Sequence, residues 1–179
     1  MSTTAKTAAT GRRLASFASA AAVVVILDQL SKVLVRDALV PGRPVTLIPH
    51  VMDLSLVYNT GAAFSVGEGQ GLLFVLIAAV ILVACAYEVF REKDMPVSLI
   101  ACLGCVCGGG VGNAIDRVVA GKVTDFFATT FMDFAVFNVA DIFITCGVFV
   151  AVALWWRWDA KREREAASAG TPGNDAQEG

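Results

Sequence analysis

Four apolar segments, each about 20 residues long, constrain this chain more than any other feature of its sequence. They run from Leu14 to about Val35, from Gly71 to about Phe90, from Pro96 to about Ile115, and from about Val136 to Trp156. A helix of that length spans the roughly 30 Å hydrocarbon core of a bilayer. With 56% hydrophobic and 17% charged residues, a water-soluble domain of 179 residues could not bury so much apolar surface. The sequence therefore predicts a mainly α-helical membrane protein with four transmembrane helices.

The first segment has a competing interpretation as a secretory signal peptide, because Lys6, Arg12 and Arg13 precede it. No small-x-small cleavage site follows, and the run is long enough to span a bilayer. A first transmembrane helix is the better interpretation.

Basic residues predict the orientation of the bundle. They precede the first segment, lie between the second and third (Arg91 and Lys93), and follow the fourth (Arg157, Lys161, Arg162 and Arg164). The positive-inside rule places these three regions in the cytoplasm, with Trp155, Trp156 and Trp158 as an interfacial anchor. Residues 1–13 and 157–179 would then be cytoplasmic tails around a membrane domain of residues 14–156. From Glu165 onwards we expect disordered chain.

Two segments are expected on the outer side. Residues 37–70 alternate in polarity and are rich in β-branched side chains, which predicts short strands on the membrane surface. Residues 116–135 are short and aromatic, which suits a lid or an interfacial helix.

Four carboxylates lie in or beside the apolar segments, at Asp28, Asp116, Asp125 and Asp141. A charged group at membrane depth is costly and persists where it is paired, hydrated or useful. The predicted topology brings all four to one level near the outer interface, with Asp125 in a loop and Asp141 about one turn inside the fourth helix.

Helical spacing separates the carboxylates into two kinds. Asp28 and Lys32 share one face at i,i+4, so we favour a structural role for that pair. Asn113 with Asp116 and Arg117, and Asn138 with Asp141, repeat this spacing in the other helices, and Arg117 could neutralise Asp116. Gly104, Gly108 and Gly112 recur at every fourth residue, which permits close helix packing.

Asp125 and Asp141 lack an obvious basic partner, because Lys122 lies in a loop and need not face Asp125. Two carboxylates in a low-dielectric site share a proton, so one can activate water while the other binds the carbonyl under attack. That arrangement is the one found in aspartic proteases. Ser31 and Ser65 have no histidine nearby to activate them.

Other functional classes fit less well. His50 is interpreted as an exposed loop residue, and the five cysteines as small buried hydrophobes, so no disulfide or metal site is predicted. The chain has no basic face for nucleic acid. A proton-coupled transporter would place its carboxylates at successive depths, and a scaffold protein would leave Asp125 and Asp141 replaceable.

Five short motifs occur in order along the chain: Asp28-Gln-Leu-Ser-Lys32, Asn59-Thr-Gly-Ala-Ala-Phe-Ser65, Gly112-Asn-Ala-Ile-Asp-Arg117, Val123-Thr-Asp-Phe126 and Phe137-Asn-Val-Ala-Asp141. Together they resemble lipoprotein signal peptidase (signal peptidase II), a family of bacterial membrane aspartyl proteases. The resemblance covers about residues 14–156.

The resemblance implies four transmembrane helices with a small extracytoplasmic β-cradle and a short periplasmic helix or lid. It implies an endopeptidase of the bacterial cytoplasmic (inner) membrane, without metal or cofactor, with its active site near the outer leaflet. Such an enzyme cuts prolipoproteins before a diacylglyceryl-modified cysteine. The expected partners are these prolipoproteins, membrane lipids and inhibitors of the globomycin type. The catalytic pair maps onto Asp125 and Asp141, and the supporting or substrate-binding positions are Asp28, Lys32, Asn59, Gly61, Asn113, Asp116, Arg117 and Asn138.

Overall fold

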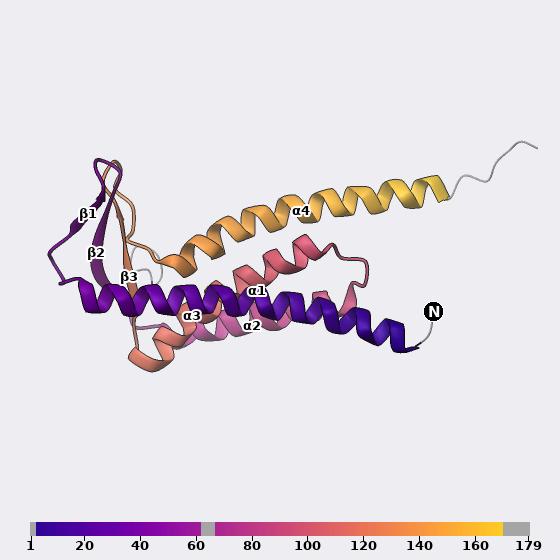
Figure 1. Ribbon diagram of the computed structural model, residues 1–179, viewed down its shortest axis with the longest axis horizontal. Helices are drawn as coiled ribbons and strands as arrows, with labels where there is room; N and C mark the ends of the chain where they lie inside the picture. Colours follow the sequence, from indigo (N-terminus) through magenta and orange to yellow (C-terminus); the bar gives the residue numbers. More distant parts are fainter. Residues whose placement is uncertain (1–2, 62–66, 170–179) are drawn as a thin grey trace, which may run out of the picture.

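Four long helices form a bundle with a small sheet at one end (Figure 1). The structure is a computed structural model that describes residues 3–61 and 67–169. The helices are α1 (Thr3–Ala38), α2 (Gly71–Arg91), α3 (Val97–Ala120) and α4 (Val139–Ala169). Each is long and apolar enough to cross a membrane, as predicted. Ser65, the serine without a nearby histidine in the sequence, lies outside the described residues.

The first and last helices are longer than the sequence suggested. α1 already begins at Thr3, within the segment expected to be a tail. α4 continues to Ala169, so the prediction of disordered chain from Glu165 onwards is wrong for residues 165–169. The added turns are rich in Ala, Glu, Lys and Arg, which favour helix, and Lys161 lies 3.6 Å from Glu165 at i,i+4.

α3 is the central helix and packs against the other three. Its glycines permit the close approach that their spacing predicted. A Cβ at Gly108 would lie 2.6 Å from the backbone oxygen of Ala21 in α1, and one at Gly109 would lie 2.6 Å from the backbone oxygen of Ala140 in α4. Because neither position has room for a side chain, α3 can contact both neighbours at the level of the backbone.

The sheet has three antiparallel strands in the order β1 (Val45–Ile48), β2 (Met52–Asn59) and β3 (Val123–Thr129). The first two confirm the strands predicted in residues 37–70. The third was not predicted: of the two forms expected for residues 116–135, a lid or an interfacial helix, the helix is absent, since this fully described segment contains only the end of α3, β3 and turns. Asp125 therefore lies on a strand, opposite Val57 of β2, and not in a loop.

The change from helix to strand is abrupt. α3 ends at Gly121, whose φ of 69° is the left-handed conformation typical of a helix C-terminus. The next residues, Val123–Thr129, are mostly β-branched or aromatic, which favours a strand once β2 offers a partner.

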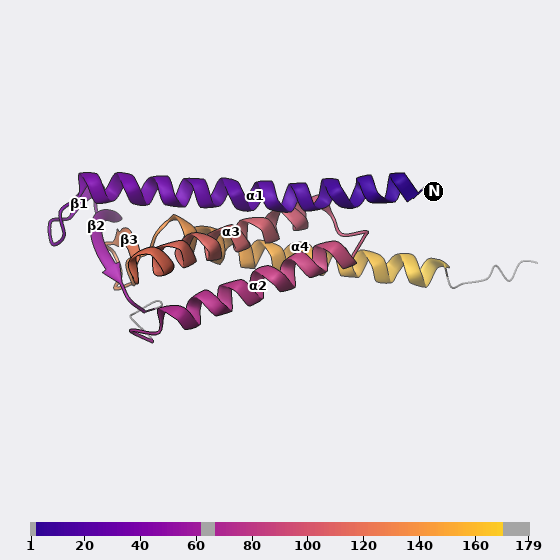
Figure 2. The same ribbon diagram turned by 90° about the horizontal axis from the view of Figure 1, so that it is seen from below.

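The start of α1 and the end of α4 lie at the same end of the bundle, together with the turn between α2 and α3 (Figures 1 and 2). We call this the terminal end and the opposite one the sheet end. The terminal end holds an apolar core that includes Phe17, Val89, Ile100 and Trp158. The sheet end holds the polar residues described next.

Candidate active site

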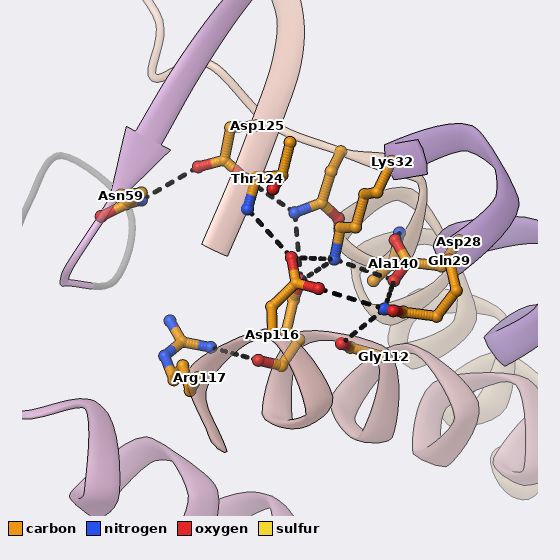
Figure 3. A network of polar contacts seen from close by, with 12 residues as sticks. Asp28, Gln29, Lys32, Asn59, Gly112, Asp116, Arg117, Thr124, Asp125 and Ala140 are labelled. Atoms are coloured by element: carbon orange, nitrogen blue, oxygen red, sulfur yellow. Dashed lines mark hydrogen bonds and ion pairs between the residues drawn. The ribbon is translucent and has the colours of Figure 1, made fainter. Parts of the chain in front are cut away.

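A buried ionic cluster joins three helices and a strand at the sheet end (Figure 3). Lys32 and Asp28 have 0% exposed side chains and are paired at 2.8 Å, and Lys32 Nζ also lies 3.3 Å from Asp116 Oδ2. Asp28 accepts a hydrogen bond from the backbone N–H of Ala140, and Asp116 accepts one from that of Thr124, each at 3.0 Å. Buried charges are tolerated when they are paired and hydrogen-bonded in this way. The cluster therefore fixes the start of α4 and of β3 relative to α1 and α3.

Two asparagines connect this cluster to the predicted catalytic carboxylates. Lys32 Nζ donates to Asn113 Oδ1 at 2.8 Å, and Asn138 Nδ2 donates to the same oxygen at 3.0 Å. Asn113 Nδ2 donates to Asp141 Oδ1 at 2.8 Å, whereas Asn138 Nδ2 donates to Asp125 Oδ1 at 2.7 Å. All four carboxylates singled out in the sequence thus belong to one connected network.

Asp141 is held by the start of α4. The backbone N–H of Asn138 donates to Asp141 Oδ2, and the backbone N–H of Asp141 donates to Asn138 Oδ1, both at 3.1 Å. This reciprocal pair is a capping box, in which side chains satisfy the free N–H groups of the first helical turn. The cap thus fixes the position of the Asp141 carboxylate, which lies in the first turn of α4 as predicted.

Asp125 is held from the other side by the sheet. Asn59, the last residue of β2, donates from Nδ2 to Asp125 Oδ2 at 3.1 Å. Its own Oδ1 accepts from the backbone N–H of Gly61 at 2.8 Å. The Asp125 side chain is 3% exposed, and each of its oxygens accepts from an asparagine.

Arg117 does not pair with Asp116, which corrects the expectation from their adjacency. Its guanidinium donates to the carbonyl of Gly61 at 2.7 Å and to that of Asn113 at 3.4 Å, and lies 5.0 Å from the ring centre of Phe74. Neighbouring residues on a helix point about 100° apart, so Asp116 turns towards Lys32 while Arg117 turns the other way.

The structure also shows the contacts of Lys122 and Gln29. Lys122 lies 3.8 Å from the ring centre of Tyr58, in line with the expectation that it need not face Asp125. Gln29 was missed by the sequence reasoning, although a polar residue in an apolar run was a usable signal. Its Nε2 donates to Asp28 at 3.1 Å and to Asp116 at 3.3 Å (Figure 3).

Asp125 and Asp141 open onto a common cavity of about 420 Å³. Asn59, Asn113 and Arg117 line its polar side. The rest of its wall is mostly apolar and comes from β3, from the segment before α4 and from α4 itself: Val123, Phe134, Ala135, Val136, Phe137, Ile142, Thr145 and Cys146. The cavity thus offers two carboxylates to a ligand that is otherwise held by apolar contacts.

The surroundings of Asp125 suit acid–base chemistry. Burial raises the pKa of Asp125 from 3.8 to about 6, against the lowering effect of the hydrogen bonds from Asn59 and Asn138. The negative charge of Asp141 adds to the rise. Within residues 3–61 and 67–169, no three histidine, cysteine or acidic side chains are grouped so that they could hold a metal ion.

Comparisons with known proteins find similar membrane enzymes. A family model described as signal peptidase (SPase) II matches residues 20–157. A lipoprotein signal peptidase from Brevibacillus brevis is 40% identical over 129 residues, which cover 72% of this chain and 86% of that protein. Another from Staphylococcus aureus is 32% identical over 148 residues, or 81% and 91% of the two chains. A solved structure of a bacterial membrane enzyme is 31% identical, with a TM-score of 0.72 over 84% of this chain and 92% of that one.

Proposed function

The chain belongs to the signal peptidase II family of proteases, and we propose that Asp125 and Asp141 are the catalytic pair with which it removes signal peptides from lipoprotein precursors. The bond cut is the one before the diacylglyceryl-modified cysteine. One observation carries the residue assignment. Asn138 donates to Asp125 with its side chain and to Asp141 with its backbone, so both carboxylates are held at one cavity.

The proposed reaction needs one proton shared by the pair. The ionised aspartate takes a proton from water, and the water oxygen attacks the scissile carbonyl carbon. The protonated aspartate donates to the carbonyl oxygen, where negative charge would otherwise develop. As the C–N bond breaks, the amide nitrogen takes a proton from the pair. The products are a new carboxyl end on the signal peptide and a free amino group on the lipid-modified cysteine.

The other residues of the network are proposed to position the pair. Asn59, Asn113 and Asn138 donate to the carboxylates and so restrict where their oxygens point. Lys32 holds Asn113 in place while it neutralises Asp28 and Asp116. Arg117 and Gly61, which are joined by a hydrogen bond, are proposed to form the edge that meets the substrate.

We propose that both termini are cytoplasmic and that the cavity lies near the outer leaflet of the bacterial cytoplasmic membrane. The basic residues at the terminal end support this orientation. Residues 14–156 would then form the peptidase domain, with residues 37–70 and 116–135 outside, between the cytoplasmic tails 1–13 and 157–179. Globomycin-type peptides are expected to inhibit by filling the cavity, and membrane lipids are expected to border it.

The direct test is cleavage of a lipid-modified prolipoprotein by purified protein in detergent. Asp125→Asn and Asp141→Asn should each abolish cleavage while the unfolding temperature stays near that of the wild type. Asp133→Asn is the matched control, because Asp133 is an exposed carboxylate that precedes α4 and lies outside the cavity wall. Full activity in either dyad variant would refute the assignment, and so would an equal loss in the control.

A further inference from the structure

A second hollow, of about 460 Å³, lies at the terminal end between α2, α3 and α4. Its wall includes Leu99 and Leu103 of α3, Cys85 of α2, and Val152 and Trp155 of α4. α2 and α4 make little contact with each other, whereas α3 packs against both. We call this hollow the terminal groove.

The terminal groove and the catalytic cavity are two separate hollows on one face of α3. Leu99 and Leu103 in the groove, and Asn113 and Arg117 in the cavity, belong to a series with spacings of four and three residues, completed by Val106 and Gly110. Residues at those spacings share one side of a helix. The groove and the cavity therefore lie on the same side of the bundle.

α4 borders both hollows in the same way. Ile142 and Cys146 line the cavity, and Val152 and Trp155 line the terminal groove. Phe149 lies between them in sequence and is 73% exposed. At 1.5 Å per residue, about 27 Å separates Asp141 at one end from Asp159 at the other. That length accommodates an apolar helix of roughly 15 residues with a few residues to spare.

Carboxylates dominate the rim of the terminal groove. Three of them, Glu88, Glu92 and Asp159, line it together with a single cation, Arg162. Arg162 is engaged with Glu92, at 3.1 Å. Arg91, outside the lining, lies 3.6 Å from Glu88 and 3.8 Å from Glu92, but its side chain is 58% exposed, so this pairing is weak.

Asp159 is the carboxylate of the rim that has no cationic partner among the described residues. It is half-buried, and no ion pair within the described part of the chain includes it. The rim thus keeps an excess of negative charge next to an apolar groove.

We propose that the terminal groove binds the apolar segment of the signal peptide before cleavage, and that Glu88 and Asp159 receive the basic residues at the N-terminus of that peptide. This inference rests on the proposed function. Signal peptides consist of a positively charged N-terminal region followed by 7–15 apolar residues. The basic region of the peptide would lie at the acidic rim, its apolar segment in the groove, and its cleavage site at Asp125 and Asp141.

The kinetic test pairs two substrates with three enzymes. One lipid-modified precursor keeps its basic N-terminal residues, and the other has them replaced by glutamine. The enzymes are the wild type, the double variant Glu88→Gln with Asp159→Asn, and the control Glu163→Gln, whose exposed carboxylate on α4 lies outside the groove. For the basic substrate, the double variant should raise KM about two- to fivefold and leave kcat unchanged, as expected for the loss of weak ion pairs that act equally on ground and transition states. For the glutamine substrate, KM should be the same in all three enzymes.

Two outcomes would overturn the proposal. One is an unchanged KM for the basic substrate in the double variant, and the other is an equal change in KM for both substrates. The second would assign the rim a structural or lipid-binding role. Neither outcome affects the proposed function, which depends on the loss of cleavage in Asp125→Asn.

Crosslinking tests the groove independently of its charge. In the Asp125→Asn protein, a photoreactive benzophenone side chain at Val152, which lines the groove, should crosslink to the bound precursor. The same side chain at Val150 should not, because Val150 is exposed on the same helix but lies outside the groove wall. Equal crosslinking from the two positions, or crosslinking to lipid alone, would contradict occupancy by the signal peptide.

Discussion

The side-chain amide of Asn138 donates a 2.7 Å hydrogen bond to Oδ1 of Asp125, from a position immediately before the first turn of α4. The same side chain caps that helix through its oxygen, which accepts from the backbone N–H of Asp141 at 3.1 Å. One residue therefore sets the beginning of a helix and the orientation of a carboxylate on a strand.

Replacing Asn138 separates these two roles. Asn138→Ala should lose the cap, at a cost of about 1 kcal/mol, and leave buried partners unsatisfied, at about 1–3 kcal/mol more. Asn138→Ser should recover the capping contribution, since serine is a good N-cap, but its short side chain does not reach Asp125. We expect both variants to lose most of their activity and the serine variant to unfold at the higher temperature. Cleavage near the wild-type rate by Asn138→Ser would show that the bond to Asp125 is dispensable.

The raised pKa of Asp125 predicts a dependence of stability on pH. Burial raises this pKa from 3.8 to about 6, so the folded protein binds the proton more tightly than the unfolded chain. This contribution to stability is fully present below about pH 4 and is lost as the pH rises through about 6, with a size on the order of 3 kcal/mol. Asp125→Asn should remove this dependence of stability on pH. The measurement is the free energy of unfolding of both proteins in detergent from pH 4 to pH 7. A difference between them that does not change over this range would contradict the raised pKa.

The buried lysine should contribute far more to stability than an exposed one. Lys32→Met leaves Asp28 and Asp116 buried without their cation, a change that costs about 3–5 kcal/mol for a buried pair. Lys161→Met is the matched control, because Lys161 pairs with Glu165 at 3.6 Å on the surface, where such pairs contribute at most about 1 kcal/mol. The measurement is thermal unfolding, in which Lys32→Met should unfold at a clearly lower temperature than Lys161→Met.

Neutralising both carboxylates tests the reason for that loss. In Lys32→Met, the added changes Asp28→Asn and Asp116→Asn should restore part of the stability, because no buried charge remains unpaired. Equal unfolding temperatures for Lys32→Met and Lys161→Met would show that the cluster does not hold the sheet end together.

The sequence was sufficient for those features that depend on composition and local spacing. Apolar runs of bilayer length located four helices, and the i,i+4 spacing of Asp28 and Lys32 indicated a pair that the structure contains at 2.8 Å. The grouping of the four carboxylates followed from the alternating direction of successive spans, which brings the ends of the first and third helices and the start of the fourth to one side of the membrane.

Local sequence patterns could not predict the features that depend on contacts between residues far apart in the chain. Asp125 lies on a strand because β2, from a remote part of the chain, provides the hydrogen-bonding edge. Asp116 and Arg117 were paired on the strength of their adjacency, but the helix turns them to different neighbours. The continuation of α4 to Ala169 was not predicted, because its charged residues form no apolar run that would indicate a transmembrane helix.

The tight contact between α1 and α3 gives a last prediction. A Cβ at Gly108 would lie 2.6 Å from the backbone oxygen of Ala21 and 2.9 Å from its Cα. Because those atoms are backbone, the helices must move apart to admit even a methyl group. Gly108→Ala should therefore destabilise the protein by about 1–3 kcal/mol, and it should reduce cleavage because Asp28 of α1 helps to hold the start of α4. Gly11→Ala is the matched control, since its Cβ would meet nothing within 4 Å, and alanine in a helix is favoured over glycine by up to about 1 kcal/mol. Unfolding temperatures should move in opposite directions for the two variants, and a stabilised Gly108→Ala protein would rule out close packing at this position.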